Sequence, residues 1–269
     1  AVARIRALEV SLFSDAVIEQ LLACKTAEQA LQLVMEKGWG DVSVSGGMDA
    51  VLKREEEKTW EVIRDVAPDM SVFDVLSYPK LYHNLKAAIK EVCTETQNPG
   101  IFYDDCQIPG REMLQIIESR EFSRLPGNMS RVAEEAFETL LHTRDGQLCD
   151  IMVDKAALEA IYEAGRRSGE PIIEDYADTT VAIADIKIAV RSQKTGKSAD
   201  FMRSAMAECT GVNVEQLIRA ALAGADEIAQ YLEGTSYAGG AEALRESPSA
   251  FERWCDNRMI ETLKPQKYE

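Results

Sequence analysis

The segment Asn84-Leu85-Lys86-Ala87-Ala88-Ile89-Lys90 recurs farther along the chain as Asp185-Ile186-Lys187-Ile188-Ala189-Val190-Arg191. Both copies run polar, aliphatic, basic, three mostly apolar residues, basic, and they lie 101 residues apart. On a helix the aliphatic residues of each copy share one face and the basic residues, four apart, share another. A single copy is typical of any amphipathic helix. The recurrence indicates helices that pack around similar cores.

A weaker, partial copy of this pattern, Arg4-Ile5-Arg6-Ala7-Leu8, lies 80 residues before the first copy. These spacings are longer than the repeats of stacked helical arrays, so they predict duplicated small helical domains. Alternation of apolar and polar residues with a period of two is scarce, and good helix formers dominate long stretches. We therefore expect an all-α protein.

Capping and breaking residues divide the chain into helices joined by short loops. Thr26 with Gln29 predicts a capping box, and Gly38 the end of that helix. Apolar spacing over 154–162 predicts a helix that ends at Gly165. Helices are predicted to start at Asn128, Pro171 and Ser247-Pro248, and Gly239-Gly240 predicts a turn.

Composition narrows the class of partner. The 269 residues carry a formal charge of −16, and the sequence pI is about 4.7. Such a chain repels phosphate backbones, and we expect neither nucleic acid nor an anionic membrane surface as a partner. The most apolar segment, 181–190, is interrupted by Asp185 and Lys187, so direct insertion into a bilayer is not expected. The six cysteines form no CxxC pair and are interpreted as separate, reduced core residues of a cytosolic protein.

Few residues suggest chemistry. Glu138 and His142 lie four apart on an expected helix and could share a metal, although a solvated pair is the more ordinary interpretation. The carboxylates Asp104-Asp105 and the cluster Glu174, Asp175 and Asp178 could act as acids or bases if buried together, but charge-dense helix faces are usually solvated. We predict no catalytic, cofactor-binding or metal-binding residue.

The segment Tyr82-His83-Asn84-Leu85-Lys86 resembles a signature of the V-type ATP synthase family of C subunits, whose eukaryotic counterpart is the d subunit of the vacuolar ATPase. The opening residues 1–9, the helix start at 151–158, the helix at 184–191 and the late segment 251–257 are also similar to segments of that family, in the same order. At position 185 the family usually has asparagine rather than aspartate. The matched positions that we predict to be structural or to lie at interfaces are Arg4, Arg6, Glu9, His83, Asn84, Leu85, Lys86, Asp154, Asp185, Arg191, Asp256 and Asn257.

The resemblance implies a funnel of three similar helical domains about a pseudo-threefold axis, here 1–80, 81–178 and 179–269. Family members continue past the last residue with one more copy of the repeated helix, so the third domain is expected to be incomplete. The implied function is that of a non-catalytic rotor subunit on the cytoplasmic side of the membrane. It would link the central shaft of the ATPase head to the membrane rotor ring during ATP-coupled transport of protons or sodium ions. The alternatives are a generic helical scaffold and, less favoured, a metal-dependent enzyme that uses Glu138 and His142.

Overall fold

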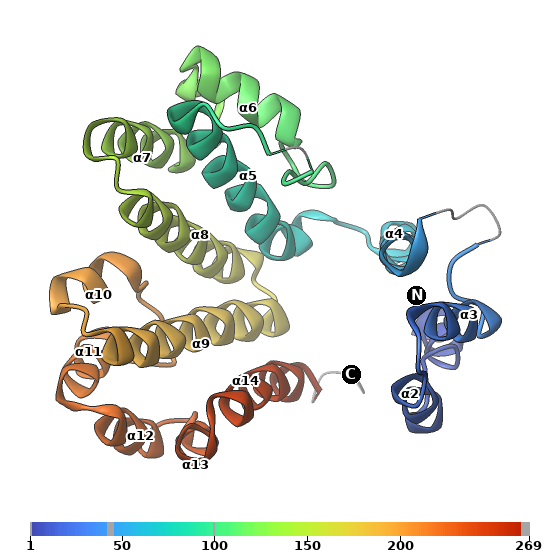
Figure 1. Cartoon of the computed structure of the whole chain (residues 1–269). Coiled ribbons are helices and arrows are strands. Elements are labelled where there is room, and N and C mark those ends of the chain that lie inside the picture. The colour runs from blue at the N-terminus through green and yellow to red at the C-terminus, as the bar shows by residue number, and fades with distance from the viewer. Residues whose placement is uncertain (1, 42–45, 99, 265–269) are drawn as a thin grey trace. The chain divides into compact units, whose positions relative to one another are not determined.

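The computed structural model describes residues 2–41, 46–98 and 100–264, and in these ranges it contains α-helices and short 3-10 turns but no strand (Figure 1). The prediction of an all-α fold is confirmed. The chain divides into two compact units, residues 1–70 and 71–269, which are considered separately.

The described residues of the first unit, 2–41 and 46–70, form four helices: α1 (Val2–Glu9), α2 (Asp15–Leu22), α3 (Ala27–Glu36) and α4 (Gly47–Val66). The predicted capping box begins α3. The Thr26 hydroxyl accepts a hydrogen bond from the backbone N–H of Gln29 (3.2 Å), and the Gln29 side chain accepts one from the Lys25 N–H (3.0 Å). Gly38 follows the helix end with φ of +89°. Both predicted boundaries of this helix are confirmed.

The second unit contains two hydrophobic cores. The 3-10 turns η1 (Ser71–Phe73) and η2 (Phe122–Arg124) and the helices α5 (Asp74–Thr94), α6 (Gly110–Ser119), α7 (Met129–Thr143) and α8 (Gly146–Ser168) form its first part. The second part consists of α9 (Pro171–Thr195), α10 (Ala199–Ala205), α11 (Val214–Ala223), α12 (Ala225–Glu233), α13 (Ala238–Glu246) and α14 (Pro248–Leu263). Leu85 and Ile89 of α5 are fully buried in the first core, and Ile186 of α9 is fully buried in the second.

The two parts repeat one packing scheme. Helix α5 packs against α6, α7 and α8, and helix α9 packs against α11, α12 and α14 (Figure 1). A shift of 101 residues moves the start of α8 at Gly146 onto Ser247, which caps the start of α14. The repeated segment therefore lies on the central helix of each part. Helices α5 and α9 span the positions 80/81 and 178/179 at which the domain boundaries were predicted.

Two local predictions are wrong because close packing, rather than local sequence, decides the role of glycine. Helix α8 continues through Gly165, where an added Cβ would lie 2.3 Å from the Cβ of Ala177 on α9. Gly239 and Gly240 lie within α13, where an added Cβ on either would approach the Trp254 ring to 2.8 Å. The predicted helix starts at Asn128, Pro171 and Ser247-Pro248 are confirmed.

The cysteines are all free thiols, as expected. Cys93, Cys149 and Cys255 are buried, and burial raises the pKa of the Cys149 thiol to about 12. Cys24, Cys106 and Cys209 are half-buried, so the expectation of core positions holds for three of the six. Within the described residues, no helix is both long and apolar enough to span a bilayer.

We expect Gly165→Ala to lower the free energy of unfolding by about 2 kcal/mol, because the new methyl group would force α8 away from α9. Gly146→Ala is the matched control, since it lies on the same helix, has no atom within 4 Å of the added Cβ and has an ordinary φ. That variant should be neutral or slightly stabilising. Urea denaturation followed by circular dichroism measures both, and equal stability of the two variants would contradict the close α8–α9 contact.

Candidate functional site

The Asn84 side chain is fully buried at the centre of α5 and holds the segment that leads to α6. Its amide nitrogen Nδ2 donates to the carbonyl oxygens of Tyr103 (2.7 Å) and Ile108 (3.2 Å), and its Oδ1 accepts from the Tyr103 N–H (2.9 Å). Both ends of the amide are therefore used. This residue stabilises the fold and is not available to a partner.

Asp185 is the counterpart of Asn84 on α9 and is also fully buried. Its Oδ1 accepts a hydrogen bond from the N–H of Ala207, in the segment that leads from α10 to α11 (3.1 Å), whereas Oδ2 has no hydrogen-bond partner. Burial raises the pKa of the carboxyl group to about 8, and the negative charge of Glu208 contributes to this rise. The backbone donor at Ala207 and the charge of Lys155 oppose this shift. At neutral pH the group is therefore largely protonated.

Three of the four basic residues of the repeated segment pair with a neighbouring helix. On α5, Lys86 pairs with Asp154 and Lys90 with Asp150, each at 2.6 Å, and both acids lie on α8. On α9, Lys187 pairs with Glu252 of α14 at 2.5 Å. These pairs are partly exposed, so each contributes about 1 kcal/mol or less to stability.

Four of the predicted positions meet at one groove. His83, Lys86, Asp154 and Arg191 line a cavity of about 440 Å³ between α5, α8 and α9. The His83 ring nitrogen Nε2 lies 2.9 Å from the Ile101 carbonyl oxygen, and the ring meets Tyr103 edge-on. Aliphatic side chains form much of the lining: Ala157, Leu158, Ile161, Ala184 and Ile188. We call this cavity the α8–α9 groove.

Arg191 also borders two neighbouring cavities. One, of about 310 Å³, lies between α8, α9 and α10 and shares Asp154 and Ile188 with the α8–α9 groove. The other, of about 140 Å³, lies between α9, α13 and α14 and shares Lys187. Arg191 is therefore the one predicted site residue that connects three hollows of the described surface.

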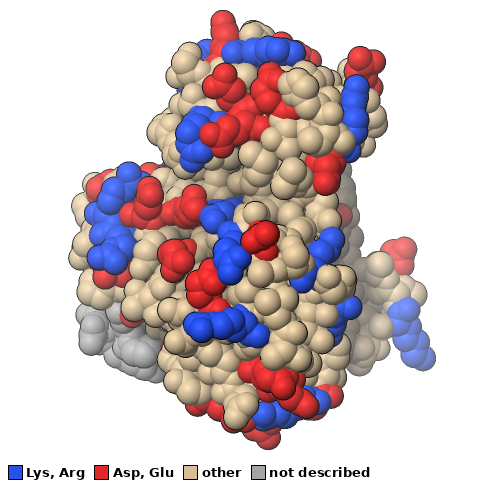
Figure 2. Space-filling view, turned by 90° about the vertical axis from the view of Figure 1, so that its left-hand side faces the viewer, with Lys and Arg blue, Asp and Glu red and all other residues tan. Residues whose placement is uncertain are grey.

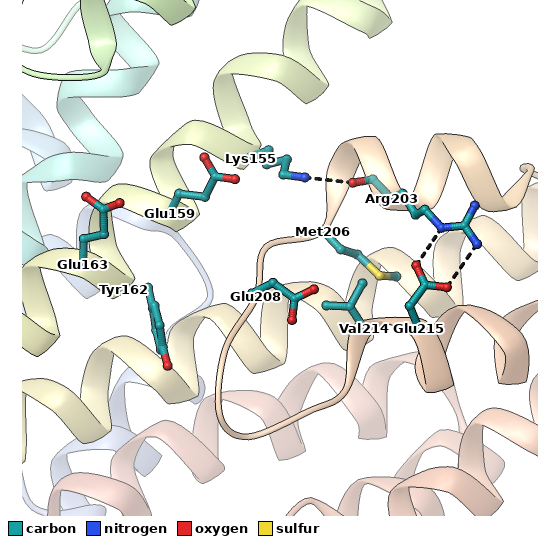
Figure 3. Close-up of a pocket in the computed structure, with 9 residues that line it drawn as sticks. All are labelled: Lys155, Glu159, Tyr162, Glu163, Arg203, Met206, Glu208, Val214 and Glu215. Atoms are coloured by element: carbon teal, nitrogen blue, oxygen red, sulfur yellow. Dashed lines mark hydrogen bonds and ion pairs between the residues drawn. The ribbon is translucent and has the colours of Figure 1, made fainter.

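An acidic cavity of about 450 Å³ lies between α8 and the segments around α10 and α11 (Figure 3). Its two bases are already engaged, because Lys155 donates to the Arg203 carbonyl oxygen (2.9 Å) and the Arg203 guanidinium binds Glu215 (2.6 Å). Figure 3 shows the carboxylates of Glu159, Glu163 and Glu208 around the hollow, and no ion pair joins them to a base of the described chain. The cavity therefore favours a cationic group.

Lysine and arginine otherwise alternate with aspartate and glutamate over the face that carries α7, α10 and α11 (Figure 2). No broad basic patch is visible on that face.

The residues that could support chemistry remain dispersed. His142 is 72% exposed and its Nδ1 lies 3.3 Å from the Glu138 carboxylate. Among the described residues no three acidic, histidine or cysteine side chains gather in a way that could hold a metal ion. Lys80 pairs with Asp105, and Asp178 accepts backbone N–H groups of Thr210 (2.6 Å) and Gly211 (3.3 Å). These contacts give the carboxylates structural partners.

The remaining predicted positions lie apart from the groove. In the first unit Arg4 pairs with Asp65 at 3.1 Å and Arg6 pairs with Glu9 at 2.9 Å. Asp256 and Asn257 are exposed on α14. The sequence reasoning missed the pairing acids Asp150 and Glu252 and the groove residues Ala184 and Ile188. The spacing of four residues shared by Lys86/Lys90 and Asp150/Asp154 was a signal that could have revealed the first pairs.

Comparison with known families matches this helical chain over residues 1–269 to the model described as ATP synthase (C/AC39) subunit. The chain belongs to this family. It is also 19% identical over 236 residues to the C subunit of the V-type sodium ATPase of Enterococcus hirae, an overlap that covers 87% of this chain and 72% of that protein. No solved structure matches the chain. The family resemblance inferred from the sequence motifs is therefore confirmed.

Family membership makes the α8–α9 groove and the acidic cavity candidates for contacts with other subunits. A C/AC39 subunit is one component of a rotary ATPase, so its surfaces include contacts with other subunits. Asn84, Leu85 and Asp185 are buried and cannot supply such contacts, whereas Arg191, Asp256 and Asn257 are exposed.

Proposed function

We propose that this chain is a non-catalytic rotor subunit of a V-type ATPase, which connects the central shaft of the ATPase head to the membrane rotor ring. The observation that carries the proposal is the match of the whole chain to the C/AC39 family. In this role the chain transmits torque between ATP hydrolysis or synthesis and ion transport. It would be held at the cytoplasmic side of the membrane through its partner subunits.

The packing of the second unit suits torque transmission. Two fully buried side chains, Asn84 and Asp185, fix long connections to the central helices, and α8 and α9 touch at Gly165. Close-packed interiors resist continuous deformation, so such a unit transmits a load with little loss. The repeated packing of α5 and α9 supports the proposal that the chain contains similar helical domains.

The charge of the chain suits a basic shaft. With a net charge of −16, the subunit attracts cationic surfaces over long range and gains specificity from complementary charge. The acidic cavity lined by Glu159, Glu163 and Glu208 supplies an acidic surface that a cationic partner could contact. Exposed Glu174 and Asp175 supply a second acidic surface. Asp178, the third member of the predicted acidic cluster, holds backbone N–H groups instead.

Binding of the separate partners tests the proposed role. We expect the chain to bind purified shaft subunits and the detergent-solubilised rotor ring in pull-down and titration experiments. A V-type ATPase assembled without the chain should still hydrolyse ATP but transport no ions. If the chain binds neither partner, the proposed function is wrong.

The same titration locates the contact with the shaft. A combined Glu159→Gln, Glu163→Gln and Glu208→Gln variant should weaken shaft binding about tenfold at low salt, and less at high salt, since exposed charges are screened. The matched control is Glu118→Gln, Glu134→Gln and Glu242→Gln, which removes the same charge outside the acidic cavity. An equal loss in both variants would show that net charge, rather than this cavity, attracts the shaft.

A further inference from the structure

Arg191 is an exposed arginine on α9 that has no acidic partner within the described residues. It borders three cavities, and the two lysines that line the α8–α9 groove with it are paired: Lys86 with Asp154 and Lys187 with Glu252. Of the bases in the two neighbouring cavities, Lys197 donates to the Gln147 side chain, and Lys194 pairs with no acid among the described residues. The acids around the groove are thus already neutralised by lysines. The charge that remains free at the centre of these hollows is positive, in a chain whose net charge is strongly negative.

The internal repeat shows which contact Arg191 lacks. Its counterpart on α5 is Lys90, which pairs with Asp150, four residues before the partner of Lys86. The same shift of 101 residues places Phe251 of α14 at the position of Asp150. Phenylalanine has no charged group to offer, so the second part of the repeat keeps the cation and lacks the carboxylate that the first part supplies.

The surroundings of Arg191 suit a polypeptide better than a free phosphate. Half-buried Leu158, Ala184 and Ile188 line the groove next to it, and Phe251 lines the cavity on its other side. An apolar groove is typical of sites that receive the apolar side chains of a bound peptide segment. Phosphate and anionic headgroups are usually held by several converging cations, whereas Lys86 and Lys187, the two lysines that line the α8–α9 groove, are already bound to carboxylates.

We propose that the α8–α9 groove binds a segment of another subunit that carries an aspartate or glutamate between apolar residues. The Arg191 guanidinium pairs with that carboxylate, and the aliphatic lining receives the flanking side chains. This inference rests on the proposed function for the identity of the partner as a subunit of the same ATPase. It goes further because it assigns the contact to the α8–α9 groove, names Arg191 as the anchoring cation, and specifies an acidic residue flanked by apolar residues as the bound segment.

Charge reversal at Arg191 tests the assignment. The variants are Arg191→Glu, Arg191→Lys and the control Arg111→Glu, which reverses an exposed arginine on α6. Each is titrated separately against purified shaft subunits, the detergent-solubilised rotor ring, and vesicles of phosphatidylcholine and phosphatidylglycerol in equal parts. Circular dichroism verifies that every variant is folded, which exposure of the two arginines leads us to expect.

Arg191→Glu should weaken binding to one of the two protein partners at least about tenfold, because it places two carboxylates face to face. Arg191→Lys should retain part of the affinity, and Arg111→Glu should match the unmodified chain. Unchanged binding of Arg191→Glu to both proteins overturns the groove assignment but leaves the proposed function intact. Failure of the unmodified chain to bind either protein overturns both. Vesicle binding that depends on Arg191, without an effect on protein binding, would identify a lipid headgroup site and overturn the proposal.

Discussion

Replacement of Asp185 by asparagine should stabilise the protein by about 2 kcal/mol at pH 8 and remove a decline in stability between about pH 5 and pH 8. The substitution keeps the acceptor for the Ala207 N–H and removes a group that ionises inside the second core. Asparagine already fills the equivalent position on α5, where both ends of the amide are hydrogen-bonded.

The direction of this pH dependence follows from the pKa of Asp185. Burial raises the pKa from 3.8 in the unfolded chain to about 8 in the folded protein. Between these values the folded state keeps the proton and the unfolded state releases it. Stability contributed by this group is therefore complete below pH 3.8, falls by about 1.4 kcal/mol per pH unit as the pH rises, and is lost above about pH 8.

Urea denaturation of both proteins at several pH values between 5 and about 8.5 measures this difference. Asp256→Asn is the control, because Asp256 is an exposed aspartate of the same unit and its loss should change stability by about 0.5 kcal/mol or less. A difference between the unmodified chain and Asp185→Asn that does not grow with pH would show that Asp185 does not titrate in this range.

The reciprocal change, Asn84→Asp, should destabilise the protein by about 3–5 kcal/mol at pH 7. The substitution replaces the amide nitrogen that donates to the carbonyl oxygens of Tyr103 and Ile108 by a carboxylate oxygen, which repels them. The site is fully buried, so water cannot compensate. Protonation would restore one donor, and the deficit should therefore shrink as the pH is lowered toward 5.

Thermal and urea unfolding of Asn84→Asp and of Asn257→Asp give the comparison. Asn257 is exposed on α14, so the same chemical change there should cost about 0.5 kcal/mol or less. Hydrogen exchange of the Tyr103 amide offers a local measurement, because its N–H donates to Asn84 Oδ1. A loss of stability as small as that of the control would mean that the Asn84 contacts do not hold the segment before α6.

The two opposite substitutions, Asp185→Asn and Asn84→Asp, also distinguish the effect of the residue type from the effect of the buried site that surrounds it. The sequence places Asn84 and Asp185 at the same point of a repeated segment. Asn84 contacts the connection between α5 and α6, and Asp185 contacts the connection between α10 and α11. The resemblance to the family of C subunits indicates that asparagine is usual at position 185. If both predictions hold, the neutral amide is the stabilising choice in both parts of the second unit.

Local sequence determined the class of fold and many helix ends. Apolar spacing along 84–90 and 185–191 depends only on the helix period, and the capping side chain of Thr26 acts within its own first turn. Pro171 and Ser247-Pro248 likewise begin helices through backbone geometry that is set within a few residues. The motifs that span the chain also identified the family without reference to any fold.

Only the tertiary structure decided what the named residues do. Gly165 lies inside α8 at the point where α9 comes too close for a larger residue. No neighbouring residue in the sequence indicates this close approach. Asn84 and Asp185 hold connecting segments inside the protein, because backbone groups 19 to 24 residues later fold back and hydrogen-bond to their side chains. Arg191 has no acidic partner because Phe251, far along the chain, occupies the place of an acid. Burial and pairing depend on contacts between distant segments, whereas helix formation depends on neighbours, and this difference separates what the sequence alone could determine from what required the fold.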